Sequence, residues 1–137
     1  MKCQLAALCE AANVSAAGQI NILGEFDTIN AAQVPVVWPL MVFVAKLKAG
    51  AADAGRHTVS LRVVDEDMRL VAPPLEAEVA LATPPIAGIE SGWPLILRIA
   101  NAHFQTVGTY LFQLRVDGTM LCELPLHVRQ TQAGGQP

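Results

Sequence analysis

Apolar and polar side chains alternate along most of the chain with a period of two, which is typical of β-strands that bury one face. Residues 57–65 show the pattern clearly, because Val59, Leu61 and Val63 fall on one face with polar side chains between them. The same alternation predicts further strands over residues 76–82, 93–101, 110–117 and 120–128. The C-terminal part of the chain is therefore predicted to be built from strands.

The N-terminal part contains three more alternating segments, at residues 2–10, 19–27 and 39–48. The first of them is ambiguous. Leu5, Leu8 and Cys9 also fit one face of a helix, and the alanines around them favour helix. A strand is the preferred interpretation, with a helix as the alternative. As a strand, this segment is predicted to point Cys3, Leu5, Ala7 and Cys9 inward.

Turn residues separate these segments at short intervals. Asp117-Gly118 is a strong hairpin sequence, because both residue types tolerate the positive φ of a tight two-residue turn. The proline pairs at 73–74 and 84–85 end strands and exclude a helix through them. Tyr110 opens a strand just after Gly108, where its hydroxyl can bond back to the upstream backbone, as in the tyrosine corner of Greek-key sandwiches.

The expected architecture is all-β. About eight short strands with frequent turns and no long helix are typical of antiparallel sandwiches and barrels. We expect an antiparallel β-sandwich of about eight strands with Greek-key connections, either immunoglobulin-like or C2-like. Residues 1–129 are predicted to form this single domain, and residues 130–137 a disordered C-terminal tail.

The composition suits a chain with a large buried core. Hydrophobic residues make up 53% and charged residues 15%, which excludes a disordered chain or a coiled coil. The net charge of −3 argues against nucleic-acid binding. The longest apolar run, residues 36–45, is much shorter than the ~20 residues of a membrane-spanning helix. Because polar residues also interrupt the N-terminal apolar stretch, we expect no signal peptide, no membrane association and a cytoplasmic location.

A set of short segments is shared with a known protein family. In chain order they are residues 3–10, 19–27, 63–67, 73–76, 108–110 and 116–118. Together they resemble a family of small bacterial proteins of unknown function that is predicted to be all-β. The resemblance covers most of residues 1–129, implies a sandwich fold and rests on structural rather than chemical motifs. It implies no activity, cofactor or site residue.

The sequence carries no catalytic or cofactor motif. Nucleophile elbows, Walker loops and paired zinc-binding histidines are absent, and the three cysteines form no C-x-x-C pair. We therefore predict a protein that is not an enzyme and holds no cofactor. The best metal candidates are Asp65 and Asp67, because calcium prefers carboxylate oxygens and calcium-binding sandwiches hold the ion between loops. The simpler interpretation is a solvated turn, since aspartate favours turns for local reasons.

The remaining indication of function comes from apolar side chains that are predicted to face outward. Strand 39–48 is apolar on both sides, and contiguous exposed apolar area marks a partner surface. The predicted interface consists of Leu40, Val42, Val44 and Ile96. The favoured function is accordingly a non-enzymatic interaction or structural module that acts through protein–protein contacts, most simply as a homo-oligomer. The alternative is a sandwich that binds calcium or a small ligand in the loops at one end.

Overall fold

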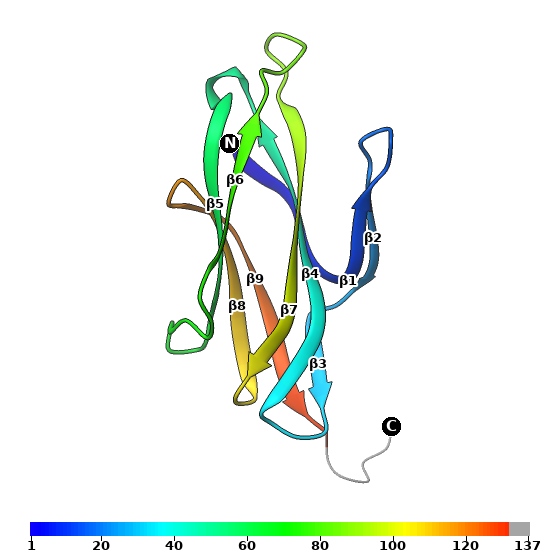
Figure 1. The fold of residues 1–137 in the computed structure, drawn as a ribbon, viewed down its shortest axis with the longest axis vertical. Coiled ribbons are helices and arrows are strands. Elements are labelled where there is room, and N and C mark those ends of the chain that lie inside the picture. The colour runs from blue at the N-terminus through cyan, green and yellow to red at the C-terminus, as the bar shows by residue number, and fades with distance from the viewer. Residues whose placement is uncertain (132–137) are drawn as a thin grey trace.

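The computed structural model describes residues 1–131, which form two β-sheets and a single 3₁₀ turn. In chain order the elements are β1 (Lys2–Val14), β2 (Ile20–Glu25), β3 (Thr28–Ala31), β4 (Val36–Ala49), the 3₁₀ turn (Ala51–Asp53), β5 (Gly55–Val64), β6 (Leu75–Leu81), β7 (Ser91–Phe104), β8 (Gly108–Val116) and β9 (Thr119–Gln130). The all-β prediction is confirmed (Figure 1). None of the helical structure in residues 1–131 is long and apolar enough to cross a membrane.

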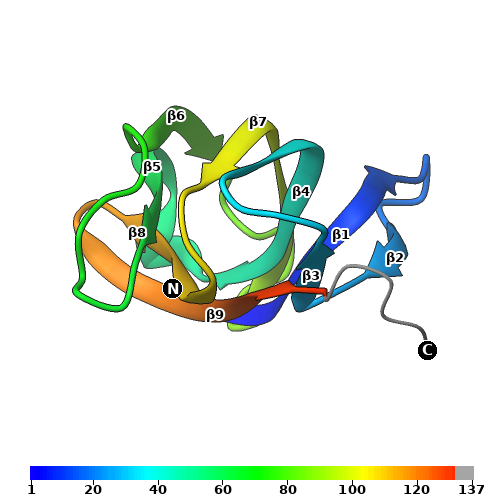
Figure 2. The same cartoon turned by 90° about the horizontal axis from the view of Figure 1, so that it is seen from below.

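The strands form a four-stranded sheet in the order β2-β1-β4-β7 and a five-stranded sheet in the order β3-β9-β8-β5-β6. In the end-on view of Figure 2, the five-stranded sheet curls around one side of the molecule like half of a barrel. On one side of the sandwich β1 packs against β9, so that the two sheets meet. On the other side the edge strands β6 and β7 lie in different sheets and do not pair (Figure 2). The two sheets are therefore in contact along one side and separate along the other.

Eight of the nine strands coincide with predicted segments, including residues 2–10, where a helix was the alternative. The strand that the alternation did not predict is β3, which has only four residues. It pairs with β9 in parallel, from Thr28 opposite His127 to Ala31 opposite Gln130. The expectation of a purely antiparallel fold is therefore wrong at this edge. The Greek-key, immunoglobulin-like or C2-like topology stays a prediction.

The core lies between the sheets and includes the fully buried rings of Phe43, Phe104 and Phe112. Its two longest strands, β4 and β7, reverse their alternation at the same level. On β4 the odd residues from Met41 to Leu47 face the core, whereas Val36 and Trp38 face it beyond Pro39. On β7 the odd residues from Trp93 to Ile99 face the core, whereas Ala102 and Phe104 face it beyond Asn101. Asn101 has φ +52°, a conformation that asparagine tolerates, and it lies at the level of Pro39. This local distortion exchanges the core-facing and outward-facing sides of both strands at the same level.

The predicted sidedness of β1 is wrong. The register against β4 shifts between Cys3 and Leu5, which is a β-bulge, and a shift of one residue moves every later side chain to the other face. Leu8 therefore packs in the main core, while Leu5 is 41% exposed.

Two of the four predicted interface residues are buried. Val42 is 2% exposed and Val44 is 0% exposed, because the β1–β2 hairpin curls over the outer face of β4. Ala12, Ile20 and Ile22 from this hairpin pack against the two valines and form a second, smaller apolar cluster. The expectation that Val42 and Val44 face a partner is therefore wrong: the apolar outer face of β4 is covered by the chain itself.

The C-terminal end of the fold extends slightly beyond the predicted domain boundary. β9 runs to Gln130, and the Thr131 amide donates a hydrogen bond of 2.8 Å to the Ala31 carbonyl of β3. Residues 130 and 131 are therefore part of the sheet rather than of a tail. The rest of the predicted disordered tail, residues 132–137, lies outside the described residues.

The predicted tyrosine corner is present. Tyr110 is 3% exposed, and its hydroxyl donates a hydrogen bond of 2.7 Å to the Thr106 carbonyl. Its ring packs edge-on against Phe104, with ring centroids 4.9 Å apart. Tyr110 therefore fixes the β7–β8 connection to the core at the end of β7. Phe104 is fully buried in this contact.

Candidate functional site

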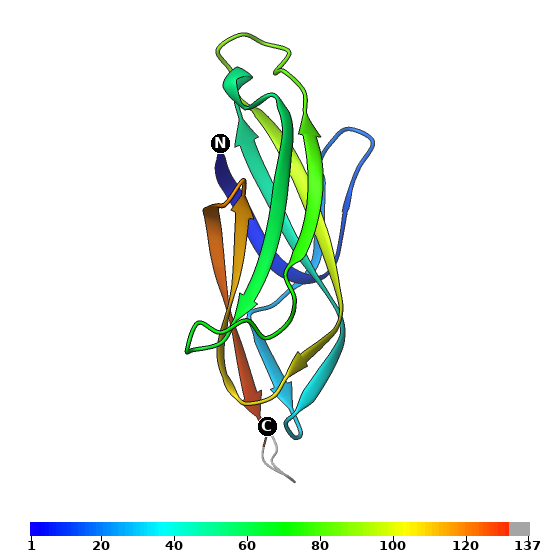
Figure 3. The same ribbon diagram turned by 60° about the vertical axis from the view of Figure 1, so that its left-hand side comes forward.

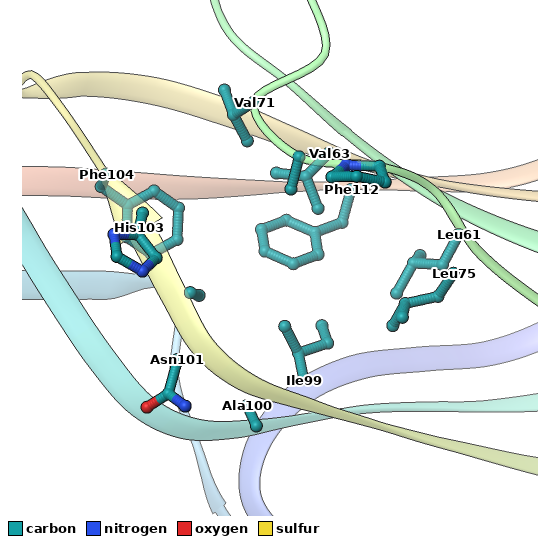
Figure 4. Close-up of a pocket in the computed structure, with 13 residues that line it drawn as sticks. Leu61, Val63, Val71, Leu75, Ile99, Ala100, Asn101, His103, Phe104 and Phe112 are labelled. Atoms are coloured by element: carbon teal, nitrogen blue, oxygen red, sulfur yellow. The ribbon is translucent and has the colours of Figure 1, made fainter.

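An apolar pocket of about 380 Å³ opens between the two unpaired sheet edges (Figure 4). Its floor consists of the buried side chains of Leu61, Phe104 and Phe112. Ile99 on β7 and Phe112 on β8 point into the same space from opposite sheets (Figure 4). The pocket therefore reaches down to the main core. Its volume is near the lower end of the roughly 300–1,000 Å³ found for small-molecule sites.

The walls and rim of the pocket come from two elements that face each other. Residues 99–104 of β7 form one side, and residues 71–73 of the β5–β6 connection together with Leu75 at the start of β6 form the other. Val71 and Ile99 are half-buried, whereas Leu75 at the rim is 40% exposed. An occupant would thus cover apolar surface that the folded chain leaves in contact with water.

Local structure explains why the pocket stays open. β6 begins only at Leu75, opposite Leu61, although β5 continues to Val64. The connection between these strands is the green loop at the left of Figure 3, in the lower half of the molecule, where the Val71 amide donates a 3.0 Å hydrogen bond to the Val63 carbonyl. Pro73 and Pro74 have no amide hydrogen and cannot extend this ladder. The edge of the five-stranded sheet is therefore irregular opposite the end of β7.

The chemistry of the lining favours binding over catalysis. Of the 13 lining residues, His103 is the one with a titratable side chain, and it is exposed at the rim. Asn101, also at the rim, adds an amide that can donate and accept hydrogen bonds. No carboxylate, thiol or lysine lines this pocket. Such a site offers an apolar cavity with a few polar groups at its mouth, which is the arrangement of a binding pocket.

The predicted metal residues lie in a tight turn after β5. Asp65 Oδ1 accepts hydrogen bonds from the amides of Asp67 and Arg69, at 2.9 and 3.0 Å. This is the usual local role of aspartate in a turn. No group of three or more His, Cys, Asp or Glu side chains in residues 1–131 is arranged to hold a metal ion. Calcium binding by Asp65 and Asp67 stays a prediction without a supporting contact.

Glu66 in the same turn has a structural partner in another loop. Its Oε1 atom accepts a 2.9 Å hydrogen bond from the Thr109 amide at the start of β8. Gly108 makes this approach possible: its φ is +144°, and a Cβ atom there would collide with Glu66 Oε1. The Glu66 carboxylate thus fastens the β5–β6 connection to the β7–β8 loop, beside the tyrosine corner. It supports the wall of the apolar pocket and does not face into it.

Two further aspartates meet around His57, near the opposite end of β5. His57 Nδ1 lies 2.6 Å from Asp117 Oδ2, and His57 Nε2 lies 2.5 Å from the Asp53 carbonyl. Both partners are acceptors, so both ring nitrogens satisfy them only when the imidazole is protonated. The hydrogen bond to Asp117 and that to the Asp53 carbonyl raise the pKa of His57, and the same His57 contact lowers the pKa of Asp117. His57 therefore joins the 3₁₀ turn to the β8–β9 hairpin.

This contact predicts a pH-dependent stability. Folding raises the pKa of His57, so its hydrogen bonds stabilise the folded protein. This contribution to the free energy of unfolding is complete below the unfolded pKa of about 6.5 and is lost as the pH rises through the pKa of the folded state. Folding lowers the pKa of Asp117, so its contribution is lost as the pH falls below about 4. Replacing His57→Gln should lower the urea midpoint most at about pH 5–6 and least above pH 8 or so. The exposed His103→Gln is the control, and an equal loss at every pH would contradict the assignment.

The four predicted interface residues do not form one exposed face. Leu40 is 47% exposed, beyond the part of β4 that the β1–β2 hairpin covers. Ile96 is half-buried beside Val44 and packs against the cluster under that hairpin. Exposed apolar side chains occur instead around the loops, with Leu70 and Leu75 close to the pocket. Sequence reasoning missed the pocket, although residues 70–75 carried a weak signal, because that stretch is apolar and has no strand period.

Comparisons with solved structures identify the fold alone. The crystal structure of a β-glucosidase from Listeria innocua in complex with isofagomine matches 94% of this chain, with a TM-score of 0.51 and 9% sequence identity. This chain covers 16% of that enzyme. The Pseudomonas fluorescens alkylpurine DNA glycosylase AlkC, bound to DNA containing an abasic site analog, matches 90% of this chain and is covered over 30% of its own length, with a TM-score of 0.45 and 13% identity. At this TM-score, the similarity to the DNA glycosylase does not establish a shared fold.

The family comparison covers nearly the whole domain. No curated protein matches this chain. The model of a family of unknown function, DUF6941, matches residues 4–129. This range agrees with residues 1–129 of the sequence prediction and includes every strand that lines the pocket. The chain belongs to this family of unknown function, DUF6941.

Proposed function

We propose that the protein is a non-enzymatic binding module that receives an apolar side chain of a protein partner in the pocket between β6 and β7. The observation that carries this proposal is the pocket itself, of about 380 Å³, which opens to solvent and is lined almost entirely by apolar side chains. Burying apolar surface stabilises a complex by roughly 25 cal/mol per Å² before association costs are subtracted. An apolar anchor in a pocket is the usual centre of a protein interface.

The composition of the pocket supports this proposal over an enzymatic one. General acid–base chemistry needs a titratable group within hydrogen-bond reach of the reacting atoms. The floor is formed by Leu61, Phe104 and Phe112, and His103 at the rim has no carboxylate among the lining residues to orient it. We therefore favour a non-enzymatic role, and the cytoplasmic location stays a prediction from the sequence.

Self-association through a different surface is a second candidate function. Leu40 and Val37 on the outer face of β4 are 47% and 46% exposed, which leaves a small apolar area for contact between copies. Native mass spectrometry of the protein tests this candidate. A discrete oligomer that Leu40→Glu dissociates would support it, and a monomer at micromolar concentration would exclude it.

A selection of peptides tests the pocket directly. A phage-displayed library of random linear peptides is panned against the protein, and the enriched peptides are synthesised. Ala102→Phe places a ring in the pocket wall and should weaken binding by on the order of tenfold or more, because the ring occupies the space of the anchor. Val71→Asp, in the opposite wall, should act in the same direction, because an apolar side chain would then desolvate a carboxylate.

The matched control is Ala80→Phe, at an exposed position of β6 outside the apolar pocket. It should bind the peptides as the wild type does. Circular dichroism spectra of all three variants confirm that each is folded. If no peptide is enriched, or if Ala102→Phe and Val71→Asp bind as tightly as Ala80→Phe, the pocket is not a binding site for protein segments.

A further inference from the structure

The free edge of β7 differs from the other sheet edges in length. β7 has 14 residues, and it pairs on one side only, with β4. The other three edge strands, β2, β3 and β6, have six, four and seven residues. An edge strand presents unpaired amide and carbonyl groups that can pair with another chain, and proteins usually keep such edges short or charged. β7 is therefore the edge on which a further strand has most room to pair.

The sequence of β7 protects this edge only weakly. Residues 95–100 contain no proline and a single charged residue, Arg98. In contrast, β6 carries the exposed carboxylates of Glu76 and Glu78 within its seven residues. Arg98 is exposed and makes no ion pair within residues 1–131. The edge thus offers backbone hydrogen-bonding groups together with one uncompensated positive charge.

This edge lies directly beside the apolar pocket. Residues 99–104 of β7 form one wall, and Ile99 points into the space (Figure 4). A strand added to β7 would place alternate side chains on opposite faces, as every strand does. The side chain level with Ile99 would face the pocket, and its neighbour level with Arg98 would face the outer side of the sheet.

We infer that the partner of the pocket is an extended peptide segment that pairs with the free edge of β7, places an apolar side chain in the pocket and sets an acidic residue next to Arg98. This inference rests on the proposed function and specifies its ligand. Backbone pairing would supply affinity, and the pocket and Arg98 would supply specificity, as in other cases of strand addition.

The surroundings of the pocket favour a single segment over a second copy of the domain. Its two walls are β7 on one side and residues 71–75 on the other. One extended strand occupies about 4.8 Å in the hydrogen-bonding direction of a sheet. A second copy that paired through its own β7 would bring its four-stranded sheet against residues 71–75, because β4 follows β7 in that sheet. The occupant is therefore expected to come from an unfolded or loop segment of another protein.

N-methylation of the peptide backbone tests the inference separately from the proposed function. Each amide of a peptide selected as above is methylated in turn, which removes one hydrogen-bond donor and keeps the side chain. Pairing with one edge predicts that methylation at alternate positions weakens binding by on the order of tenfold, with little effect at the positions between them. Amide exchange in β7 should slow at alternate residues between 95 and 100 when the peptide binds, before the reversal at Asn101. Arg98→Glu should weaken peptides with an acidic residue beside the anchor, whereas Arg115→Glu, on a strand away from this edge, should not.

The outcomes separate the two claims. Binding that depends on the pocket and alternates along the peptide backbone supports strand addition. Binding that Ala102→Phe abolishes but that no N-methyl group weakens leaves the proposed function intact and overturns strand addition. Protection of the β7 edge in the free protein that disappears on dilution would identify a second copy as the occupant and also overturn it. Failure to select any pocket-dependent peptide overturns both.

Discussion

Replacing Val42→Glu should unfold the protein or cost at least about 4 kcal/mol, because the carboxylate would be buried without a partner. Val42 is 2% exposed, and the β1–β2 hairpin covers it through contacts with Ala12, Ile20 and Ile22. A domain of this kind is typically stable by about 5–15 kcal/mol, so the loss would take a large part of the total. The urea midpoint and the far-ultraviolet circular dichroism spectrum measure it.

The matched variant is Leu40→Glu, two residues away on the same strand. Leu40 is 47% exposed, so a carboxylate there stays in water and should change the free energy of unfolding by less than about 1 kcal/mol. If Val42→Glu instead keeps the stability of the wild type, the hairpin does not cover β4. The outer valines would then face solvent or a partner, as the sequence alone suggested.

Replacing Phe112→Ala should cost about 3–5 kcal/mol, the usual loss for a fully buried aromatic side chain. Phe112 is 0% exposed and lies between the main core and the floor of the pocket. Its removal should also enlarge the pocket and expose the floor to solvent. Chemical denaturation measures the loss of stability, and an increase in the binding of an apolar fluorescent dye reports the larger cavity.

Phe26→Ala serves as the comparison for the same chemical change. Phe26 is only half-buried, and its main aromatic neighbour is Trp38, with ring centroids 6.2 Å apart. Its removal should cost about 1–2 kcal/mol, because less apolar area returns to water. Equal losses for the two variants would show that Phe112 is not at the centre of the core.

Strand positions were predictable because alternation is a local property of the sequence. Asp117-Gly118 forms the β8–β9 hairpin, with φ +51° and +84°, as the dipeptide predicts. β3 was not predictable, because residues 28–31 are too few to show a period and their partner β9 lies about a hundred residues away. The parallel pairing of β3 with β9 depends on where the fold places these two strands, on the side where the two sheets meet. The sequence of β3 by itself does not encode it.

The faces of the strands were harder to predict than the strands themselves. One bulge near Cys3 inverts β1, and the distortion at Pro39 and Asn101 inverts the ends of β4 and β7. The two-sided apolar pattern of β4 led to the prediction of an exposed outer face, because the pattern carries no information about what covers that face. A hairpin of the same chain covers the outer face, where a partner was expected.

The pocket could not be predicted from the sequence, because its lining comes from four separate parts of the chain. β5, the β5–β6 connection, β7 and β8 each contribute, and only the fold brings them together. The residues predicted for metal binding, Asp65 and Asp67, instead belong to a turn next to the loop that supports the pocket. The surplus of apolar residues thus led to a predicted partner surface on β4, whereas the structure buries Val42 and Val44 there and leaves an apolar pocket elsewhere.

Amide hydrogen exchange of the free protein tests the central claim, which is that the two sheets are open between their edge strands β6 and β7. An open edge predicts that alternate amides of residues 95–100 exchange rapidly, with the alternation reversed beyond Asn101, while the amides of the central strand β4 are protected. The same pattern should hold at every protein concentration. Slow exchange of all amides in residues 95–104 would contradict the account, because it would mean that another strand already covers the free edge of β7.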